Sequence, residues 1–106
     1  MSQKIRAIIK RPDEEYGHMT NISNTLENMQ RTVGGYIEAI TYGESFGFPR
    51  FTVICNEEGR IREMPYNCCI GGNLLFGDII IVGVDSDEIT DCPLTFQQWK
   101  KILDSQ

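Results

Sequence analysis

The stretch NEEGRIREMPYNCCIGG, residues 56–72, brings together the residue types that a nucleotide pocket needs. Arg60 and Arg62 lie two apart, so on a strand they would share one face, and the planar guanidinium of arginine matches phosphate oxygens in two-point contact. Arg50 opens the preceding strand, where it could sit close to both. Aromatic rings can stack on a base, and asparagine amides can read its edge. The candidate ligand-binding residues are Tyr36, Arg50, Asn56, Arg60, Arg62, Tyr66, Asn67, Gly71 and Gly72, and Asn73 and Phe76 offer a further amide and ring.

A purely structural role accounts for the same residues. The two arginines could pair with nearby glutamates on a wet surface, Tyr66 could cover the core, and the glycines could serve only to form turns. The residue types leave both interpretations open.

The groups that most enzymes use are scarce. His18 is the only histidine, and it lies in a short segment that reads as an exposed strand or turn. Glu57 and Glu58 are adjacent but fall in an expected turn, where carboxylates are usually solvated. The two Gly-Gly pairs lack the GxxxxGK[ST] context of a phosphate-binding loop. We therefore expect no catalytic residue and no enzyme activity.

Metal binding is not expected either. The four cysteines, Cys55, Cys68, Cys69 and Cys92, contain no Cys-x-x-Cys spacing, whereas tetrahedral zinc sites usually pair their ligands closely. The acidic segment 85–91 lacks the glycine and glutamate that an EF-hand loop requires at its sixth and twelfth positions. The sequence predicts reduced, half-buried thiols, no metal and no cofactor.

Length and charge set further bounds. A chain of 106 residues is expected to form a single domain, 1–106. The net charge of −5 argues against a long nucleic acid as partner, because phosphate neutralisation dominates that affinity, but it leaves room for a small anionic ligand. No segment is apolar and long enough to span a membrane or to act as a secretory signal, so a cytoplasmic location is expected.

The hydrophobic pattern predicts the elements that would position these residues. A helix of about ten residues is expected from a cap at Asn24, with Glu27 completing a capping box, to Gly34-Gly35. A second helix is expected after a cap at Thr95, answered by Gln98. Strands are predicted at 4–10, about 17–22, 36–42, 50–56, 60–63 and 78–84, with 64–77 irregular and 85–91 a solvated loop.

The sum of these elements predicts an α+β fold. Short connections favour a mostly antiparallel sheet of about five or six strands, and we expect the two helices to cover one face of it. The almost wholly apolar segment 78–84 predicts a central strand with both faces covered.

Four segments occur in an order that resembles a family of small domains of unknown function, common in bacteriophages and mobile elements of Gram-positive bacteria. They are GGYIEAI (34–40), VICNEEGRI (53–61), MPYN (64–67) and GDIIIVG (77–83), and the resemblance covers most of residues 4–103. The chain departs from that pattern at Met64, where leucine is usual, and at Cys68-Cys69, which replace residues that are often basic.

The resemblance implies a phage or prophage setting, in which small acidic proteins often act against host defences. One such class consists of sponges, which are oligomers that trap cyclic nucleotide immune signals without cleaving them. With the arginine, aromatic and asparagine residues above, the expected partners are a small anionic nucleotide and further copies of the chain. The alternative is an acidic protein-interaction module that inhibits a host defence enzyme, and a phosphodiesterase ranks third.

Overall fold

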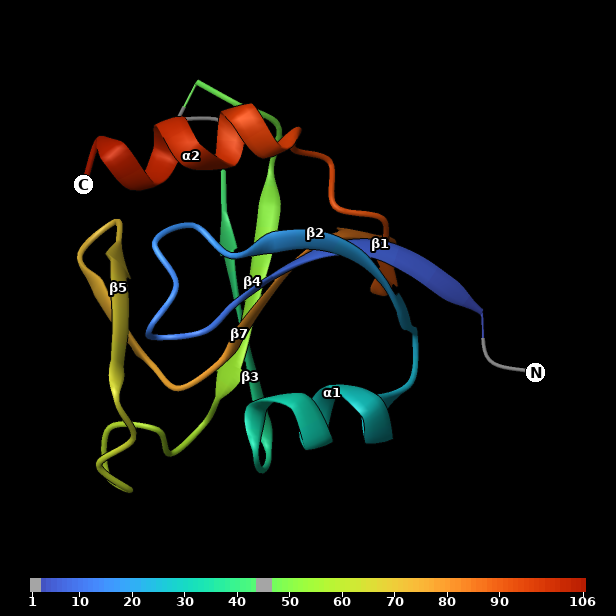
Figure 1. Ribbon diagram of the computed structural model, residues 1–106. Coiled ribbons are helices and arrows are strands. Elements are labelled where there is room, and N and C mark those ends of the chain that lie inside the picture. Colours follow the sequence, from blue (N-terminus) through green and yellow to red (C-terminus); the bar gives the residue numbers. More distant parts are fainter. Residues whose placement is uncertain (1–2, 44–46) are drawn as a thin grey trace.

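The computed structural model of the chain describes residues 3–43 and 47–106, and these fold into two sheets and two helices (Figure 1). Neither described helix has the length and apolar character needed to cross a membrane. In chain order the elements are β1 (Lys4–Lys10), β2 (His18–Ser23), α1 (Leu26–Val33), β3 (Ile37–Tyr42), β4 (Phe51–Asn56), β5 (Tyr66–Ile70), β6 (Asn73–Phe76), β7 (Ile79–Asp85), β8 (Glu88–Thr90) and α2 (Phe96–Asp104).

The main sheet has six strands. Five of them follow the order β2-β1-β7-β4-β3, and β8 pairs with β7. Every strand pairing in the described residues is antiparallel. β7 lies between β1 and β4, and its first five residues are buried, because an apolar strand at the centre of a sheet loses contact with water on both faces. The predicted α+β class, the mostly antiparallel sheet and the central position of this strand are confirmed.

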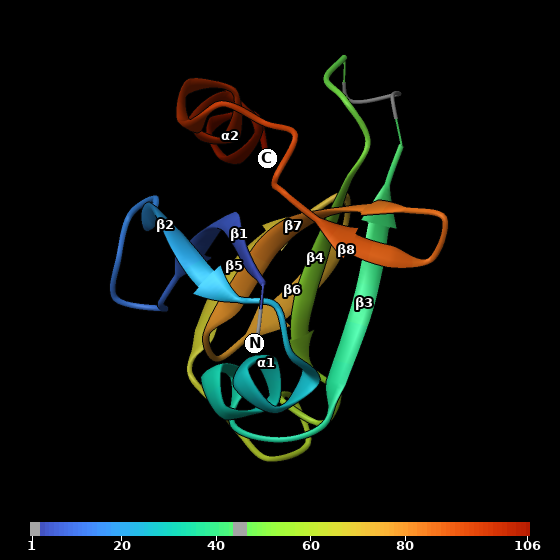
Figure 2. The same cartoon turned by 90° about the vertical axis from the view of Figure 1, so that its right-hand side faces the viewer.

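The two helices cover opposite faces of this sheet, so the expectation that they share one face is wrong (Figures 1 and 2). Side chains alternate between the two faces of β7. Ile79 and Ile81 join a core that contains Trp99 of α2, whereas Ile80 and Val82 join a second core that contains Met29 of α1. Both sides of an apolar central strand need cover, and one helix on each side supplies it.

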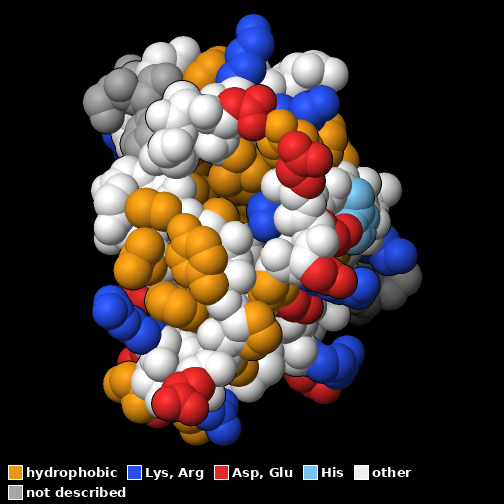
Figure 3. Space-filling view, turned by 60° about the vertical axis from the view of Figure 1, so that its left-hand side comes forward, with side chains coloured by type: hydrophobic (Ala, Val, Ile, Leu, Met, Phe, Trp, Pro, Cys, Tyr) orange, Lys and Arg blue, Asp and Glu red, His pale blue; other side chains and the backbone are white. Residues whose placement is uncertain are grey.

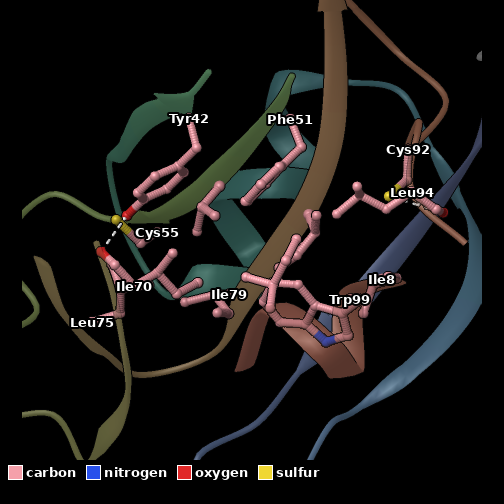
Figure 4. Packing of buried hydrophobic residues seen from close by; sticks show 13 residues of the cluster. Ile8, Tyr42, Phe51, Cys55, Ile70, Leu75, Ile79, Cys92, Leu94 and Trp99 are labelled. Atoms are coloured by element: carbon pink, nitrogen blue, oxygen red, sulfur yellow. Dashed lines mark hydrogen bonds between the residues drawn. The ribbon is translucent and has the colours of Figure 1, made fainter. Parts of the chain in front are cut away.

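The first core lies under α2 and is closed on one side by the β5–β6 hairpin (Figure 4). Trp99 is fully buried and meets the ring of Phe51 edge to face at 6.5 Å. Tyr42 stacks on Phe51 at 5.1 Å and donates a hydrogen bond of 3.1 Å to the carbonyl oxygen of Ile70. These contacts fix the hairpin against the main sheet.

Three local predictions after β4 are wrong. Residues 60–63 form turns instead of a returning strand, and 64–77 is not irregular, because it contains β5 and β6. Part of the expected solvated loop 85–91 is β8, which pairs with the end of β7. The β5–β6 hairpin turns at Gly71 and Gly72, with φ values of 56° and 83°. Positive φ at both central residues is what a type I′ turn requires, so the backbone conformation accounts for this pair of glycines.

The helix caps follow the sequence in one case and depart from it in the other. Thr95 and Gln98 form the predicted capping box at the start of α2. α1 is capped by Thr25, whose hydroxyl accepts from the Asn28 N–H at 3.1 Å, so the predicted cap at Asn24 is wrong. The Asn24 amide donates instead to the carbonyl oxygen of Ile89 at 2.9 Å, a contact between distant segments that local pattern does not show.

Candidate functional site

The segment after β4 turns in a helix-like path that separates the two central arginines. The Arg62 N–H donates to the carbonyl oxygen of Glu58 at 2.8 Å, and the Glu63 N–H donates to that of Arg60 at 3.1 Å. With 3.6 residues per turn, side chains two apart point about 200° away from each other. Arg60 and Arg62 therefore line two different hollows instead of sharing the face of a strand.

Arg50 lies far from both, and its expected proximity to them is wrong. It precedes β4 at the end where Phe51 pairs with Tyr42, whereas the turn follows the other end, where Asn56 pairs with Ile37. At about 3.3 Å per residue, β4 separates Arg50 from Asn56 by roughly 20 Å. The three guanidinium groups do not converge.

The Arg60 hollow lies between β3, β4 and the β5–β6 hairpin and has a volume of about 380 Å³. Its lining includes Glu38, Ile40, Arg60, Asn73 and Phe76, together with Gly72 at the hairpin turn. Arg60 is exposed, and in the part of the chain that the structure describes no carboxylate lies within 4.0 Å of its guanidinium. The hollow thus combines an unpaired cation, an aromatic ring, the amides of Asn56 and Asn73, and the carboxylates of Glu38 and Glu57.

The Arg62 hollow is separate and has a volume of about 340 Å³. It is lined by Gln30, Gly35, Tyr36, Glu58 and Arg62. The Tyr36 side chain is 70% exposed, and the Arg62 guanidinium donates at 3.5 Å to the carbonyl oxygen of Gly34. Like Arg60, Arg62 makes no ion pair with a glutamate within the described residues, so the surface ion pairs considered from the sequence do not form.

The Lys10 hollow, of about 410 Å³, lies beside the other strand of the hairpin and contains Tyr66 and Asn67. Lys10 lines it but is only 3% exposed, and its ammonium donates to Asn67 Oδ1 at 2.9 Å and to the Arg11 carbonyl oxygen at 3.3 Å. Figure 3 shows the molecule from the side of the hairpin, with apolar side chains gathered beside a hollow that acidic and basic groups border. Tyr66 and Leu74, 52% and 46% exposed, belong to the hairpin.

Two of the predicted amides serve the fold. Asn56 is 6% exposed; its amide nitrogen donates to the carbonyl oxygen of Val33 at 3.1 Å, and its amide oxygen accepts from the Glu58 N–H at 2.7 Å. Asn67 is 8% exposed and is bonded to Lys10 and Gly77. The Gly71 N–H donates to Gln106 Oε1 at 2.8 Å. The predicted site residues other than Arg50 therefore divide among three hollows, two buried amide anchors and a hairpin turn, and Arg50 belongs to none of these groups.

Sequence reasoning missed several features of these hollows. Glu38 and Ile40 were predicted only as part of the strand 36–42, and the buried position of Lys10 was not foreseen. The alternation of Glu38 and Ile40 on β3 does carry a signal, because both point to the face on which the hairpin packs. A further hollow of about 660 Å³ lies between the start of β1 and residues 87–91, and it contains none of the predicted site residues.

Two of the thiols, those of Cys55 and Cys68, have pKa values that keep them protonated near neutral pH. Burial, with the neighbouring Glu38 carboxylate, raises the pKa of Cys55 to about 11, and burial raises the pKa of Cys68 to about 11. A protonated thiol is a weak nucleophile and a weak metal ligand. All four cysteines are free, as predicted, and no cluster of three or more His, Cys, Asp or Glu that could hold a metal occurs within residues 3–43 and 47–106.

Alkylation kinetics check these pKa values. Folded protein treated with iodoacetamide at about pH 8 should lose the Cys68 thiol roughly ten- to hundredfold more slowly than the same chain in denaturant, because far less thiolate is present. Peptide mass spectrometry follows the reaction at Cys68, and the rate in the folded protein should climb as the pH approaches 11. Equal rates in the folded and unfolded chains would contradict the raised pKa.

Comparison with known families decides what kind of domain this is. A family described as a domain of unknown function, DUF3846, matches residues 5–105, which is nearly the whole chain. The chain belongs to the DUF3846 family. Its match spans all the strands that border the three hollows, so the hollows are part of the DUF3846 domain. Searches of curated proteins and of solved structures found no match to this DUF3846 chain.

Proposed function

We propose that this DUF3846 domain is a non-enzymatic binding protein that sequesters a small cyclic nucleotide in the Arg60 hollow. The observation that carries the proposal is the exposed Arg60 guanidinium, unpaired within the described residues, at a hollow that also offers a ring and polar base-reading groups. We assign the protein to a phage or prophage setting, in the host cytoplasm, where it would remove an immune signal. That assignment comes from the family resemblance read in the sequence.

Four of the side chains that line the hollow have a task in such a site. The Arg60 guanidinium can hold phosphate oxygens through two parallel N–H donors. Phe76 offers an apolar ring for a base, and a hollow of about 380 Å³ lies within the range of small-molecule sites. The Glu38 carboxylate can accept from base N–H groups, and the Asn73 amide can both donate and accept. Phosphate holding, stacking and edge reading are thereby available in one place.

Two observations support retention of the ligand without its conversion. The thiol beside this hollow, Cys55, has a pKa of about 11 and is a poor nucleophile near neutral pH. His18 is exposed on β2, and its Nδ1 lies 3.5 Å from a carboxylate oxygen of Glu14. His18 is not among the residues that line the Arg60 hollow. The groups around Arg60 are therefore suited to binding.

A panel of cyclic dinucleotides, followed by thermal shift and by recovery of the nucleotide after denaturation, tests the proposal. We expect one or more members to stabilise the protein and to be recovered intact. Arg60→Ala should weaken that binding about tenfold to a hundredfold, because a charge-assisted hydrogen bond contributes roughly 1.5–3 kcal/mol. Calorimetric titration of wild type and variant gives the two affinities.

Two matched controls come from the same chain. Arg50→Ala and Arg62→Ala remove the same charge, the first roughly 20 Å away along β4 and the second in a separate hollow. Both should bind like wild type. If Arg50→Ala weakens binding as much as Arg60→Ala, only net charge matters and the Arg60 hollow is not the site. Recovery of degraded nucleotide would instead identify an enzyme.

A second candidate is an acidic module that inhibits a host defence enzyme by contact. The net charge of −5 and two strongly exposed aliphatic side chains, Ile61 at 81% and Leu26 at 58%, favour this alternative. It predicts no thermal shift with any nucleotide, and co-purification with a host enzyme that is lost in Ile61→Asp. The nucleotide panel therefore separates the two candidates before any partner is sought.

A further inference from the structure

β3 forms one edge of the main sheet, and within residues 3–43 and 47–106 no strand pairs with the outer side of its backbone (Figure 2). The Glu57 N–H donates to the Tyr36 carbonyl oxygen at 2.9 Å, which sets the phase of the β3–β4 ladder. Because bonded pairs alternate along antiparallel strands, Glu38, Ile40 and Tyr42 direct their backbone groups to β4. The N–H and C=O groups of Ile37, Ala39 and Thr41 therefore point away from the sheet.

This edge lacks three of the features that commonly prevent pairing, and its one charged residue is the exposed Glu38. Edge strands are commonly blunted by proline, lysine or a β-bulge. The sequence of β3, IEAITY, contains neither proline nor lysine, and its six pairs with β4 run without a shift in register. Ala39 and Thr41 are exposed, and Tyr36, immediately before the strand, is 70% exposed. An open edge of this kind is suited to the addition of another strand.

We propose that the added strand is β3 of a second copy of this chain, paired antiparallel about a two-fold axis at Ala39. In that register Ile37 lies opposite Thr41 of the second copy, and Ala39 lies opposite Ala39 of the second copy. Every residue whose backbone groups point away from β4 therefore meets a residue of the same kind in the other strand. A shift of one residue would place a residue whose N–H and C=O groups are free opposite a residue whose N–H and C=O groups are bonded to β4. A shift that centres the axis on Glu38 would put two like charges directly opposite, which is destabilising.

The second copy also completes the Arg60 hollow, a step that rests on the function proposed above. Glu38 and Ile40 line this hollow. In the proposed register Glu38 of one copy lies opposite Ile40 of the other, and the reverse pair lies on the other side of the axis. The two Arg60 hollows consequently meet across the axis and form one groove with an arginine at each end. A groove with two-fold symmetry matches a cyclic dinucleotide of two like bases, whose two phosphates are related in the same way.

The mass in solution tests the dimer without any ligand. We expect wild type at twice the chain mass of 12.1 kDa, and Ala39→Lys at the mass of one chain. The substitution places two ammonium groups face to face at the axis, whereas the Ala39 backbone groups take no part in the ladder with β4. Ala39→Pro, which removes the outward N–H and fixes φ at about −65°, should have the same effect. Gln97→Lys, an equal charge change on the exposed side of α2, should remain dimeric.

Thermal melts establish that each variant is folded, and the outcomes separate the two proposals. A wild-type protein with the mass of one chain overturns the dimer, and so does one that pairs with a strand of another protein instead of a second copy. A dimeric Ala39→Lys variant overturns it as well. A dimer that depends on Ala39 but binds no cyclic dinucleotide sustains this inference and removes the proposed ligand. Monomeric Ala39→Lys that binds as tightly as wild type keeps the ligand and overturns the shared groove; we expect at least a tenfold loss.

Discussion

Replacement of Trp99 by alanine should lower the free energy of unfolding by about 3–5 kcal/mol, the cost of removing a large aromatic side chain from a packed core. Trp99 is fully buried in the core beneath α2 and contacts the ring of Phe51 edge to face. Its indole N–H donates to the Tyr16 carbonyl oxygen at 2.8 Å, so the substitution also leaves that acceptor without its donor. Urea denaturation monitored by circular dichroism measures the loss.

Two variants separate burial from a general effect of changing α2. Gln97→Ala alters an exposed neighbour on the same helix and should change the free energy of unfolding by less than about 0.5 kcal/mol. Trp99→Phe keeps a ring but removes the N–H donor, so it should fall between wild type and Trp99→Ala. A loss below about 1 kcal/mol for Trp99→Ala would mean that α2 does not dock on the sheet.

The effect of Trp99 should extend to the candidate site, because α2 helps to hold the hairpin that forms one wall of it. The Gly71 N–H donates to Gln106 at the end of the chain, and the Tyr16 hydroxyl donates to Asp104 at 2.6 Å. Tyr42 fixes the same hairpin from the sheet side through the Ile70 carbonyl oxygen. The position of Phe76 and Asn73 in the Arg60 hollow thus depends on contacts at the turn of the hairpin.

Local pattern was sufficient wherever one segment determines its own conformation. The apolar run 78–84 predicted the central strand, because a strand buried on both faces shows a continuous apolar run. Thr95 with Gln98 predicted the cap of α2, because both residues of a capping box lie within one turn of the chain. The segment 36–42 was likewise predicted as a strand from its own residues, and β3 covers Ile37–Tyr42. These features are the ones for which neighbouring residues supply the partners.

Prediction failed where the partner lies far away in the chain. Asn24 looked like a helix cap, but its amide bonds with Ile89, sixty-five residues later. RIRE alternates charged and apolar residues like a strand, yet its backbone groups bond within the turn, so Arg60 and Arg62 separate. Arg50 looked close because a hairpin was assumed, and without the returning strand nothing brings it back. Lys10 became buried because Asn67, on a hairpin that was not predicted, accepts from its ammonium.

The second large effect is expected at that buried pair. Asn67→Ala should lower the free energy of unfolding by about 3–5 kcal/mol, because it leaves the buried Lys10 ammonium with only the Arg11 carbonyl oxygen, at 3.3 Å, as acceptor among the described residues. The Asn67 amide oxygen accepts from Lys10 Nζ at 2.9 Å, and its amide nitrogen donates to the carbonyl oxygens of Lys10 at 2.9 Å and Gly77 at 2.8 Å. Both side chains are less than 9% exposed, so water does not readily replace these bonds.

A double-mutant cycle shows whether the Lys10 ammonium is the cause. Lys10→Met removes the charge that Asn67 satisfies, so Lys10→Met with Asn67→Ala should cost 0.5–3 kcal/mol less than the sum of the two single losses, the usual range for residues in contact. Some loss remains, because the carbonyl oxygens of Lys10 and Gly77 still lack their donor. Asn73 lies on the same hairpin but is exposed, and its amide donates a hydrogen bond of 3.2 Å to the Tyr42 hydroxyl, so Asn73→Ala should cost about 1 kcal/mol or less. Strictly additive losses in urea denaturation would show that Asn67 serves only the backbone carbonyls, and that the Lys10 ammonium is satisfied without it.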